Sequence, residues 1–248
     1  MFILLSILMC LPAFLFFITI SRNIFGKIYI ISIEANIGSG KSTFLTKLQK
    51  LHPEWFFLLE PVDIWKSITD TSGNSILSEF YKNQKRFAYT FQNFAFITRV
   101  STLNAMIQKI KQSTSIFQNK YLIVERSIYS DKNVFAKMLY DNQNISNLEY
   151  ELYLYWFHKL HSNMLVSGHI YLQVDPTISF NRVKKRARKE EVDCVPLEYL
   201  KSVHLYHDTW LNNTPVPTLV INADLEFEND EVQLKNMDNS IKPFIERL

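Results

Sequence analysis

The chain has 248 residues, of which 47% are hydrophobic, which is enough for the core of one large α/β domain. Its formal net charge of +3 is too small for bulk nucleic-acid binding, so we expect no nucleic-acid partner. The two cysteines, Cys10 and Cys194, are too few for a disulfide framework and favour a reducing compartment such as the cytoplasm.

The first 20 residues are almost wholly apolar, and about 20 such residues can span a bilayer as a helix. No basic residue precedes Arg22, unlike in a cleaved signal peptide, and an Arg-rich amphipathic mitochondrial pattern is missing. Arg22 and Lys27 follow the segment, which favours a cytoplasmic location for the rest of the chain. We interpret residues 1–22 as a membrane anchor or a dispensable extension, and residues 23–248 as one folded domain.

A strand, a glycine-rich loop and a helix are predicted next. The apolar run Ile28–Ile33 predicts the strand, and Thr43–Leu51 has a helical pattern. The loop between them reads ANIGSGKST, in which the glycines let backbone N–H groups turn around a phosphate. A nucleoside triphosphate would be bound by Asn36, Ile37, Gly38, Ser39, Gly40, Lys41, Ser42 and Thr43. The full pattern begins with Gly, and this chain has Ala35 there.

Four further strands and several helices follow along the chain. The strands are predicted over 55–59, 121–124, 169–174 and 218–222, and the helices over 76–110, 131–140, 147–165 and 196–210. Short apolar strands alternating with helices predict an α/β fold with a parallel sheet of about five strands, covered by helices on both faces. Ligands of such sheets bind beyond the carboxyl ends of the strands.

Two of the predicted strands end in charged residues. Glu60 follows the second strand, where a carboxylate facing a triphosphate can accept the proton of an attacking hydroxyl. Glu125 and Arg126 follow the third strand and offer a carboxylate for magnesium and a guanidinium for the reacting oxygens. These side chains are therefore expected to meet beside the glycine loop.

A basic run, RVKKRARK, covers residues 182–189. Such a run is usually a solvated helix face, and nuclear targeting or nucleic-acid contact is a weaker alternative. Arg182 and Arg186 lie four residues apart on one helical face, where they repel unless an anion lies between them. The run therefore predicts a mobile lid near 182–195 that carries arginines over phosphates.

Six segments of the chain carry a resemblance to a known family: 35–43, Glu60-Pro61-Val62 with Trp65, Phe91-Gln92, 125–131, 182–191 and 196–200. In this order and spacing they resemble the deoxyribonucleoside kinase family, of the deoxycytidine and deoxyguanosine kinase type, from about Lys27 to beyond Glu228. The segment 222–226 is similar to the multisubstrate insect enzyme. The resemblance implies a P-loop kinase fold, ATP-dependent 5′-phosphorylation of deoxyribonucleosides, magnesium and a homodimer built on helices.

The resemblance also implies roles for the residues around the phosphates. Glu60 is then the general base on the 5′-hydroxyl, with Arg126 as its partner. Ser42 and Glu125 are expected to bind the magnesium ion. The lid would consist of Arg182, Arg186 and Arg188.

For the nucleoside, the resemblance implies that Gln92 hydrogen-bonds to the edge of the base. It also implies that Tyr81 and Glu191 bind the 3′-hydroxyl of the sugar. Phe135 and Phe94 are expected to stack on the base or line its pocket. The full set of expected substrate-binding residues is Trp65, Tyr81, Gln92, Ala95, Arg99, Asp131, Phe135 and Glu191.

Arg99 and Asp131 are predicted to influence substrate choice. Gln92, Ala95 and Arg99 share one helical face, and an Arg–Asp pair in the pocket presents donors and acceptors to a base edge. Family members of the deoxycytidine and deoxyguanosine type have such a pair. We therefore expect a preference for deoxyadenosine, deoxyguanosine or deoxycytidine over thymidine.

Two other functions fit the same sequence. A nucleoside monophosphate or thymidylate kinase would need a further basic clamp at the acceptor in place of a glutamate base. A membrane-anchored nucleotide-binding protein without catalysis is suggested by residues 1–20 and Ala35.

Overall fold

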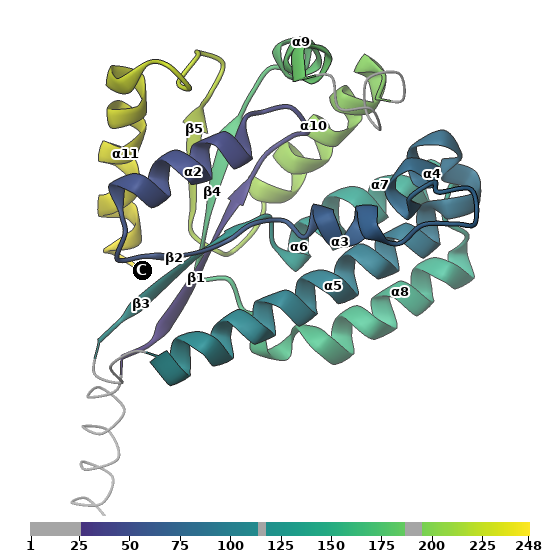
Figure 1. The fold of residues 1–248 in the computed structure, drawn as a ribbon, viewed down its shortest axis with the longest axis horizontal. Helices are drawn as coiled ribbons and strands as arrows, with labels where there is room; N and C mark the ends of the chain where they lie inside the picture. Colours follow the sequence, from purple (N-terminus) through teal and green to yellow (C-terminus); the bar gives the residue numbers. More distant parts are fainter. Residues whose placement is uncertain (1–25, 114–117, 187–194) are drawn as a thin grey trace, which may run out of the picture.

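The computed structural model describes residues 26–113, 118–186 and 195–248, which form a five-stranded parallel sheet with helices on both faces (Figure 1). The strands are β1 (Ile28–Glu34), β2 (Phe56–Leu58), β3 (Lys120–Glu125), β4 (Gly168–Gln173) and β5 (Thr218–Asn222). Their order in the sheet is β2-β3-β1-β4-β5. The predicted fold class is confirmed.

The register of the sheet brings the predicted site residues to one edge. Ile33 of β1 lies opposite Glu125 of β3, and Leu58 of β2 lies opposite Val124. The strands are parallel, so the glycine loop after β1, Glu60 after β2 and Arg126 after β3 all leave the sheet at the same edge.

One face of the sheet is covered by α2 (Lys41–Leu51) and α11 (Glu231–Ile245), which lie side by side in Figure 1. Phe44 and Leu48 of α2 and Ile241 of α11 pack in one cluster with Ile31 and Ile170 of the sheet. These side chains are almost completely buried, so this layer is a continuous apolar core.

The opposite face is covered by α5 (Gln84–Ser113), α8 (Asn147–Leu160) and α10 (Leu197–Leu211) (Figure 1). Phe96 of α5 and Phe157 of α8 pack against Leu122 of β3. Ser146 caps α8 in a capping box with Glu149, which satisfies two of its free backbone donors.

Shorter helices surround the edge where the strands end. They are α3 (Val62–Ser67), α4 (Ile76–Lys82), α6 (Ile128–Ser130), α7 (Lys137–Asp141) and α9 (Pro176–Arg186). A 3-10 turn over His161–Asn163 lies elsewhere, between α8 and the start of β4. Trp65 of α3, Phe80 of α4 and Phe91 of α5 form a separate apolar cluster. This cluster places an aromatic wall beside the charged strand ends.

Several helix predictions differ from the structure. The single helix predicted over 76–110 is divided at Asn83, whose side chain accepts a hydrogen bond from the N–H of Arg86. The helix predicted over 131–140 begins as a π-helix, Asp131–Ala136, and continues as α7. The helix predicted over 147–165 ends at Leu160, and α3 and α11 were not predicted.

No helix in the described ranges is long and apolar enough to cross a membrane. The apolar segment 1–22 lies outside those ranges, so the question of an anchor stays a prediction.

The packing of α11 predicts a stability difference between two of its β-branched residues. Ile241→Ala should lower the free energy of unfolding by about 2–5 kcal/mol, because Ile241 is completely buried against the sheet. Val232→Ala is the control, since Val232 is 71% exposed, and it should change stability by no more than about 0.5 kcal/mol. Urea denaturation measures both; equal effects would contradict α11 as part of the core.

Candidate functional site

A cavity of about 610 Å³ opens at the carboxyl ends of β1, β2 and β3. Its walls come from the glycine loop, α3, α4, α5, the turn after β3, α9 and the segment after β5. Most of the predicted site residues line it: Ile37, Gly38, Gly40, Lys41, Ser42, Thr43, Glu60, Trp65, Tyr81, Gln92, Ala95, Arg99, Glu125, Arg126, Asp131, Phe135, Arg182 and Arg186.

A few predicted residues are not in this lining. Asn36 and Ser39 are buried in the loop, where the Asn36 amide donates to Leu200 O and the Ser39 hydroxyl to Asn36 O. Phe94 packs in the aromatic cluster and does not line the cavity. Arg188 and Glu191 lie outside the described residues, so their roles stay predictions.

The glycine loop has the backbone that its sequence predicts. Gly38 and Gly40 have φ angles of 78° and 90°, in the left-handed region that favours glycine. A Cβ at Gly38 would lie 2.5 Å from Ser179 O, so space also requires glycine there. Ala35 is completely buried and is not among the described non-glycine residues with positive φ, so its Cβ introduces no backbone strain.

Lys41 is held against the loop that precedes it. Its Nζ donates to Asn36 O at 2.6 Å and to Ala35 O at 3.2 Å, and the side chain is almost completely buried. Burial, reinforced by the positive charge of Arg126, lowers the pKa of Lys41 to about 7. The ammonium is therefore in place to meet an anion at the start of α2, and its charge is sensitive to pH.

Glu60 is the centre of a buried charged cluster. Arg126 Nη1 lies 3.1 and 3.0 Å from its two carboxylate oxygens, and Arg99 Nη2 donates to its Oε1 at 2.8 Å. Burial alone would raise the pKa of Glu60, but Arg126, Arg99 and Lys41 outweigh it and lower the pKa to about 2. The carboxylate is therefore ionised throughout the physiological pH range.

Arg99 joins this cluster to Asp131. Its Nε and Nη2 donate to the two Asp131 oxygens at 2.8 and 3.2 Å, as the sequence predicted, and its Nη1 donates to Glu125 O at 2.9 Å. Burial lowers the pKa of Arg99, but the carboxylates of Asp131 and Glu60 outweigh it and raise the pKa above its usual value. Asp131 begins the π-helix, a distortion that often occurs at functional sites.

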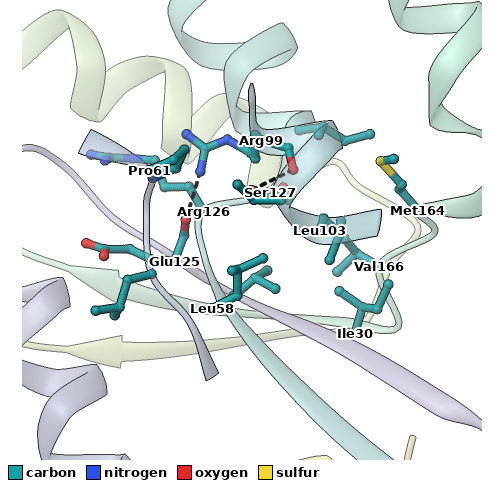
Figure 2. A pocket seen from close by; sticks show the side chains of 14 residues that line it. Ile30, Leu58, Pro61, Arg99, Leu103, Glu125, Arg126, Ser127, Met164 and Val166 are labelled. Carbon is teal, nitrogen blue, oxygen red and sulfur yellow. Dashed lines mark hydrogen bonds between the residues drawn. The ribbon is translucent and has the colours of Figure 1, made fainter. Parts of the chain in front are cut away.

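Apolar side chains pack next to the charged cluster. Figure 2 shows Arg99, Arg126 and Glu125 on one side of a small cavity, with Leu58, Leu103, Val166, Ile30 and Met164 on the other. The cavity has a volume of about 10 Å³, room for about one water. The low polarity of these side chains lowers the local dielectric constant, which strengthens the electrostatic interactions beside them.

Ser42 and Glu125 can hold a magnesium ion. The Ser42 hydroxyl donates to Glu125 Oε1 at 2.7 Å, so a hydroxyl and a carboxylate oxygen meet at the start of α2. No cluster of three or more His, Cys, Asp or Glu ligands occurs among the described residues. Mg²⁺ commonly binds through one or two protein oxygens, water and substrate phosphates, and this pair fits that pattern.

Aromatic and amide side chains line the part of the cavity beyond Glu60. Trp65 donates from Nε1 to Thr98 Oγ1 at 2.8 Å and packs edge-on against Phe91. Phe135 lies 5.1 Å from the Arg126 guanidinium. Gln92 is buried, and no hydrogen bond joins its amide to another described residue. This end of the cavity combines flat apolar walls with an amide that bonds to no other described residue, which suits a heteroaromatic ring.

Arg182 binds backbone carbonyls. Its guanidinium donates to Ser39 O of the glycine loop and to Ala223 O, Asp224 O and Leu225 O after β5, at 3.0–3.3 Å. It therefore links α9 to both segments that border the cavity. Arg186 lines the cavity one helical turn further along α9.

Sequence reasoning missed part of the cavity wall. The lining also contains Leu59, Val62, Asp63, Lys66, Leu77, Phe80, Phe91, Lys185, Tyr199, Glu226, Phe227 and Glu228. Five of these lie in segments that resembled the family, which was an available signal: Val62, Phe91, Lys185, Tyr199 and Glu226. Phe227 packs edge-on against Phe44 and lies against Gly40, a contact that no local pattern reveals.

Comparison with known proteins agrees with this geometry. The family model for deoxynucleoside kinases matches residues 31–246, which include every element described above except the start of β1. The match therefore spans the whole cavity.

Several curated proteins are similar over most of their length. The mitochondrial deoxyguanosine kinase of Xenopus laevis is 34% identical over 87% of this chain and 89% of its own. Deoxycytidine kinase 2 of Gallus gallus is 33% identical with the same coverage, and the probable deoxycytidine kinase of fowlpox virus is 34% identical over 88% of both chains. The chain therefore belongs to the deoxynucleoside kinase family, whose enzymes transfer phosphate to nucleosides.

Proposed function

We propose that this enzyme transfers the γ-phosphate of ATP, with Mg²⁺, to the 5′-hydroxyl of deoxyribonucleosides and yields their monophosphates. The observation that carries the proposal is the position of Glu60. Its carboxylate lies between the glycine loop and the aromatic end of the cavity, held by Arg126 and Arg99. A hydroxyl acceptor placed there is within reach of both a base and a phosphate.

Glu60 accepts the hydrogen bond of the 5′-hydroxyl and then its proton. A carboxylate with a pKa near 2 is a weak base, so an early proton transfer is unfavourable. Phosphoryl transfer has a loose transition state in which the attacking hydroxyl becomes acidic late, so a positioned carboxylate suffices. As phosphate oxygens compete for Arg126, Glu60 loses part of the interaction that lowers its pKa, and its basicity rises.

The phosphates bind at the other end of the cavity. The N–H groups of the loop and the start of α2 surround them, and Lys41 and Arg126 supply positive charge. Arg186 lines the cavity from α9, and in this proposal it forms the lid over the phosphates together with Arg182 and Arg188. Ser42 and Glu125 hold the magnesium ion, which neutralises charge on the phosphate oxygens when it is bound.

The nucleoside occupies the aromatic end. Gln92 pairs with the edge of the base, and Trp65 and Phe135 enclose its faces. Tyr81 and Glu191 hold the 3′-hydroxyl. The Arg99–Asp131 pair favours deoxyadenosine, deoxyguanosine or deoxycytidine over thymidine, because a charged pair occupies the volume that the thymine methyl group needs.

A labelled phosphate transfer assay tests this function against its alternatives. The full chain is incubated with ATP labelled at the γ-phosphate and with each deoxynucleoside or each deoxynucleoside monophosphate. Labelled monophosphates support the proposal. Labelled diphosphates alone would indicate a monophosphate kinase, and nucleotide binding without transfer would indicate a non-catalytic protein.

The proposal includes a homodimer formed through α8. Leu148, Leu152 and Tyr155 recur on one face of α8 and are 71%, 44% and 54% exposed, and the neighbouring Trp156 is 46% exposed. Large apolar side chains exposed together mark an association surface. A second copy of the chain, packed helix against helix, would bury them.

The proposal assigns catalysis to residues 23–248 and places the enzyme in the cytoplasm. The family match begins at residue 31, and none of the residues proposed to contact ATP, magnesium or the nucleoside precedes Asn36. Residues 1–22 are therefore dispensable for catalysis, and any membrane association of the enzyme would depend on them.

Glu60→Gln should lower kcat by about 10²- to 10⁴-fold, because the amide keeps the size of the side chain but cannot accept the proton. Stability should also fall, since Arg126 and Arg99 lose a buried counter-charge. Glu79→Gln, on α4 outside the cavity lining, is the control and should leave kcat unchanged. Steady-state kinetics well below the melting temperature measures both. Near-normal turnover of Glu60→Gln would refute this role.

Triphosphate binding should be linked to proton uptake by Lys41. The pKa of Lys41 is about 7 in the free protein, and a bound polyanion raises it. Binding should therefore take up about 0.1 proton at pH 6 and about 0.9 proton at pH 8, and affinity should weaken as pH rises above 7. Calorimetry in buffers of different ionisation enthalpy measures the uptake.

Lys41→Arg is the matched control for this linkage, because a guanidinium remains charged at every pH used. It should abolish the increase in proton uptake between pH 6 and pH 8. An equal increase in Lys41→Arg would show that another group takes up the proton.

Arg99→Met combined with Asp131→Ala should raise kcat/KM for thymidine relative to that for deoxyguanosine. The double change removes the pair together and leaves no stranded charge, whereas Asp131→Ala alone leaves Arg99 Nε without its partner and should impair all substrates. Measurement of kcat/KM for all four deoxynucleosides checks both statements. A strong thymidine preference of the unmodified enzyme would contradict control by this pair.

A further inference from the structure

Arg126 has an unusual backbone conformation for a residue with a large side chain. Its φ angle is 60°, in the left-handed region, and it is one of two described non-glycine residues with positive φ. In this conformation its guanidinium contacts both Glu60 oxygens and Ala35 O. The chain must supply interactions that hold this turn, since most residues other than glycine leave the left-handed region when they are free to do so.

The next residue, Ser127, is bound to Glu34. The Ser127 N–H donates to Glu34 Oε1 at 3.0 Å, and the Ser127 hydroxyl donates to the same oxygen at 2.7 Å. Ser127 occupies the N-cap position of α6, where a serine side chain normally accepts a hydrogen bond from the helix. It makes no such bond here, because its hydroxyl is directed to Glu34.

Glu34 lies completely buried at the end of β1. Its second carboxylate oxygen, Oε2, is buried without a hydrogen-bond partner among the described residues. The nearest histidine, His169, has Nδ1 4.0 Å from Glu34 Oε1 and 2.7 Å from Ser32 Oγ. Burial lowers the pKa of His169, so at neutral pH the ring supplies no compensating positive charge.

A buried carboxyl group with one unsatisfied oxygen is costly for stability. Both side-chain hydrogen bonds that Glu34 makes with described residues go to Ser127, next to Arg126. Burial lowers the pKa of Arg126, but Glu60 and Glu125 outweigh it and raise the pKa, and the charge of Glu34 adds to theirs. Glu34 therefore lies where it can fix both the backbone and the charge of Arg126.

We propose that Glu34 is a positioning residue for phosphoryl transfer, which binds Ser127 and thereby holds the Arg126 guanidinium against Glu60 and the reacting oxygens. The inference rests on the proposed roles of Glu60 and Arg126. Glu34 itself does not line the cavity and does not contact a substrate. Its effect is geometric, since a guanidinium displaced by about 1 Å can slow a reaction by about 100-fold.

Glu34→Gln in the full chain tests this role. The amide keeps the shape of the side chain, but it replaces two charge-assisted hydrogen bonds with neutral ones that are about half as strong. We expect kcat to fall about 10- to 100-fold, while KM for the deoxynucleoside and for ATP changes by less than about threefold.

Asp208→Asn is the matched control for loss of a hydrogen-bonded carboxylate. Asp208 accepts hydrogen bonds from Tyr171 Oη at 2.7 Å and from Gln173 Nε2 at 3.1 Å, and it does not line the cavity. The kcat of Asp208→Asn should stay within about twofold of that of the unmodified enzyme. Equal kcat values for Glu34→Gln and Asp208→Asn would overturn the inference.

A double-variant cycle separates positioning from a general structural effect. In an Arg126→Ala background, Glu34→Gln should lower kcat by less than about twofold further, because the group that it positions is already absent. If the kcat losses of the two single variants multiply in the double variant, the inference is overturned. If Glu34→Gln does not fold, Ser127→Ala replaces it in the cycle, with an expected loss of about 3- to 10-fold in the single variant.

A crystal structure of Glu34→Gln tests the inference without an activity assay. The separation of Arg126 Nη1 from the Glu60 oxygens should increase beyond hydrogen-bond distance, and an unchanged separation would overturn the inference. If the unmodified chain phosphorylates no deoxynucleoside, the proposed function fails, and this structural measurement still decides whether Glu34 positions Arg126.

Discussion

Four charges connected by hydrogen bonds, of which three are buried and Glu60 is mostly buried, hold the site together. Arg126 binds Glu60, Glu60 binds Arg99, and Arg99 binds Asp131. The removal of each charge from water costs several kcal/mol, which only well-oriented opposite charges offset. The four residues come from the ends of β2 and β3, from the middle of α5 and from the π-helix. The cluster therefore forms only when these distant segments have reached their final positions.

Arg99 gives this cluster a property that a simple ion pair lacks. It binds the carboxylate proposed as the base and the carboxylate proposed to select the nucleoside, and it also binds the backbone of Glu125 beside the magnesium side. One guanidinium thus connects the residues proposed to bind the nucleobase, to activate the hydroxyl and to hold magnesium. A change at Arg99 that is meant to alter specificity will also change the basicity of Glu60, because Arg99 helps to lower the pKa of Glu60.

The parts of the site that the sequence predicts are those with a local signal. The glycine loop is contiguous, the strand ends follow apolar runs, and the spacing of Gln92, Ala95 and Arg99 places them on one helical face. The contacts of Arg99 with Glu60 and of Ser127 with Glu34 join residues 39 and 93 positions apart, and no periodicity encodes them. Helix α11 had a readable pattern in Leu234, Met237, Ile241 and Ile245, whereas the π-helix did not.

The π-helix over Asp131–Ala136 has a consequence for how this enzyme can change by insertion or deletion. A π-helical turn holds about one residue more than an α-helical turn, and one residue corresponds to a rotation of about 100° about the helix axis. Deletion of one residue between Asp131 and Phe135 would restore regular α-helix, and these two residues, then three positions apart, would still share one helical face. The site can therefore tolerate the loss of one residue from this short segment, provided that the Asp131 carboxylate and the Phe135 ring themselves are kept.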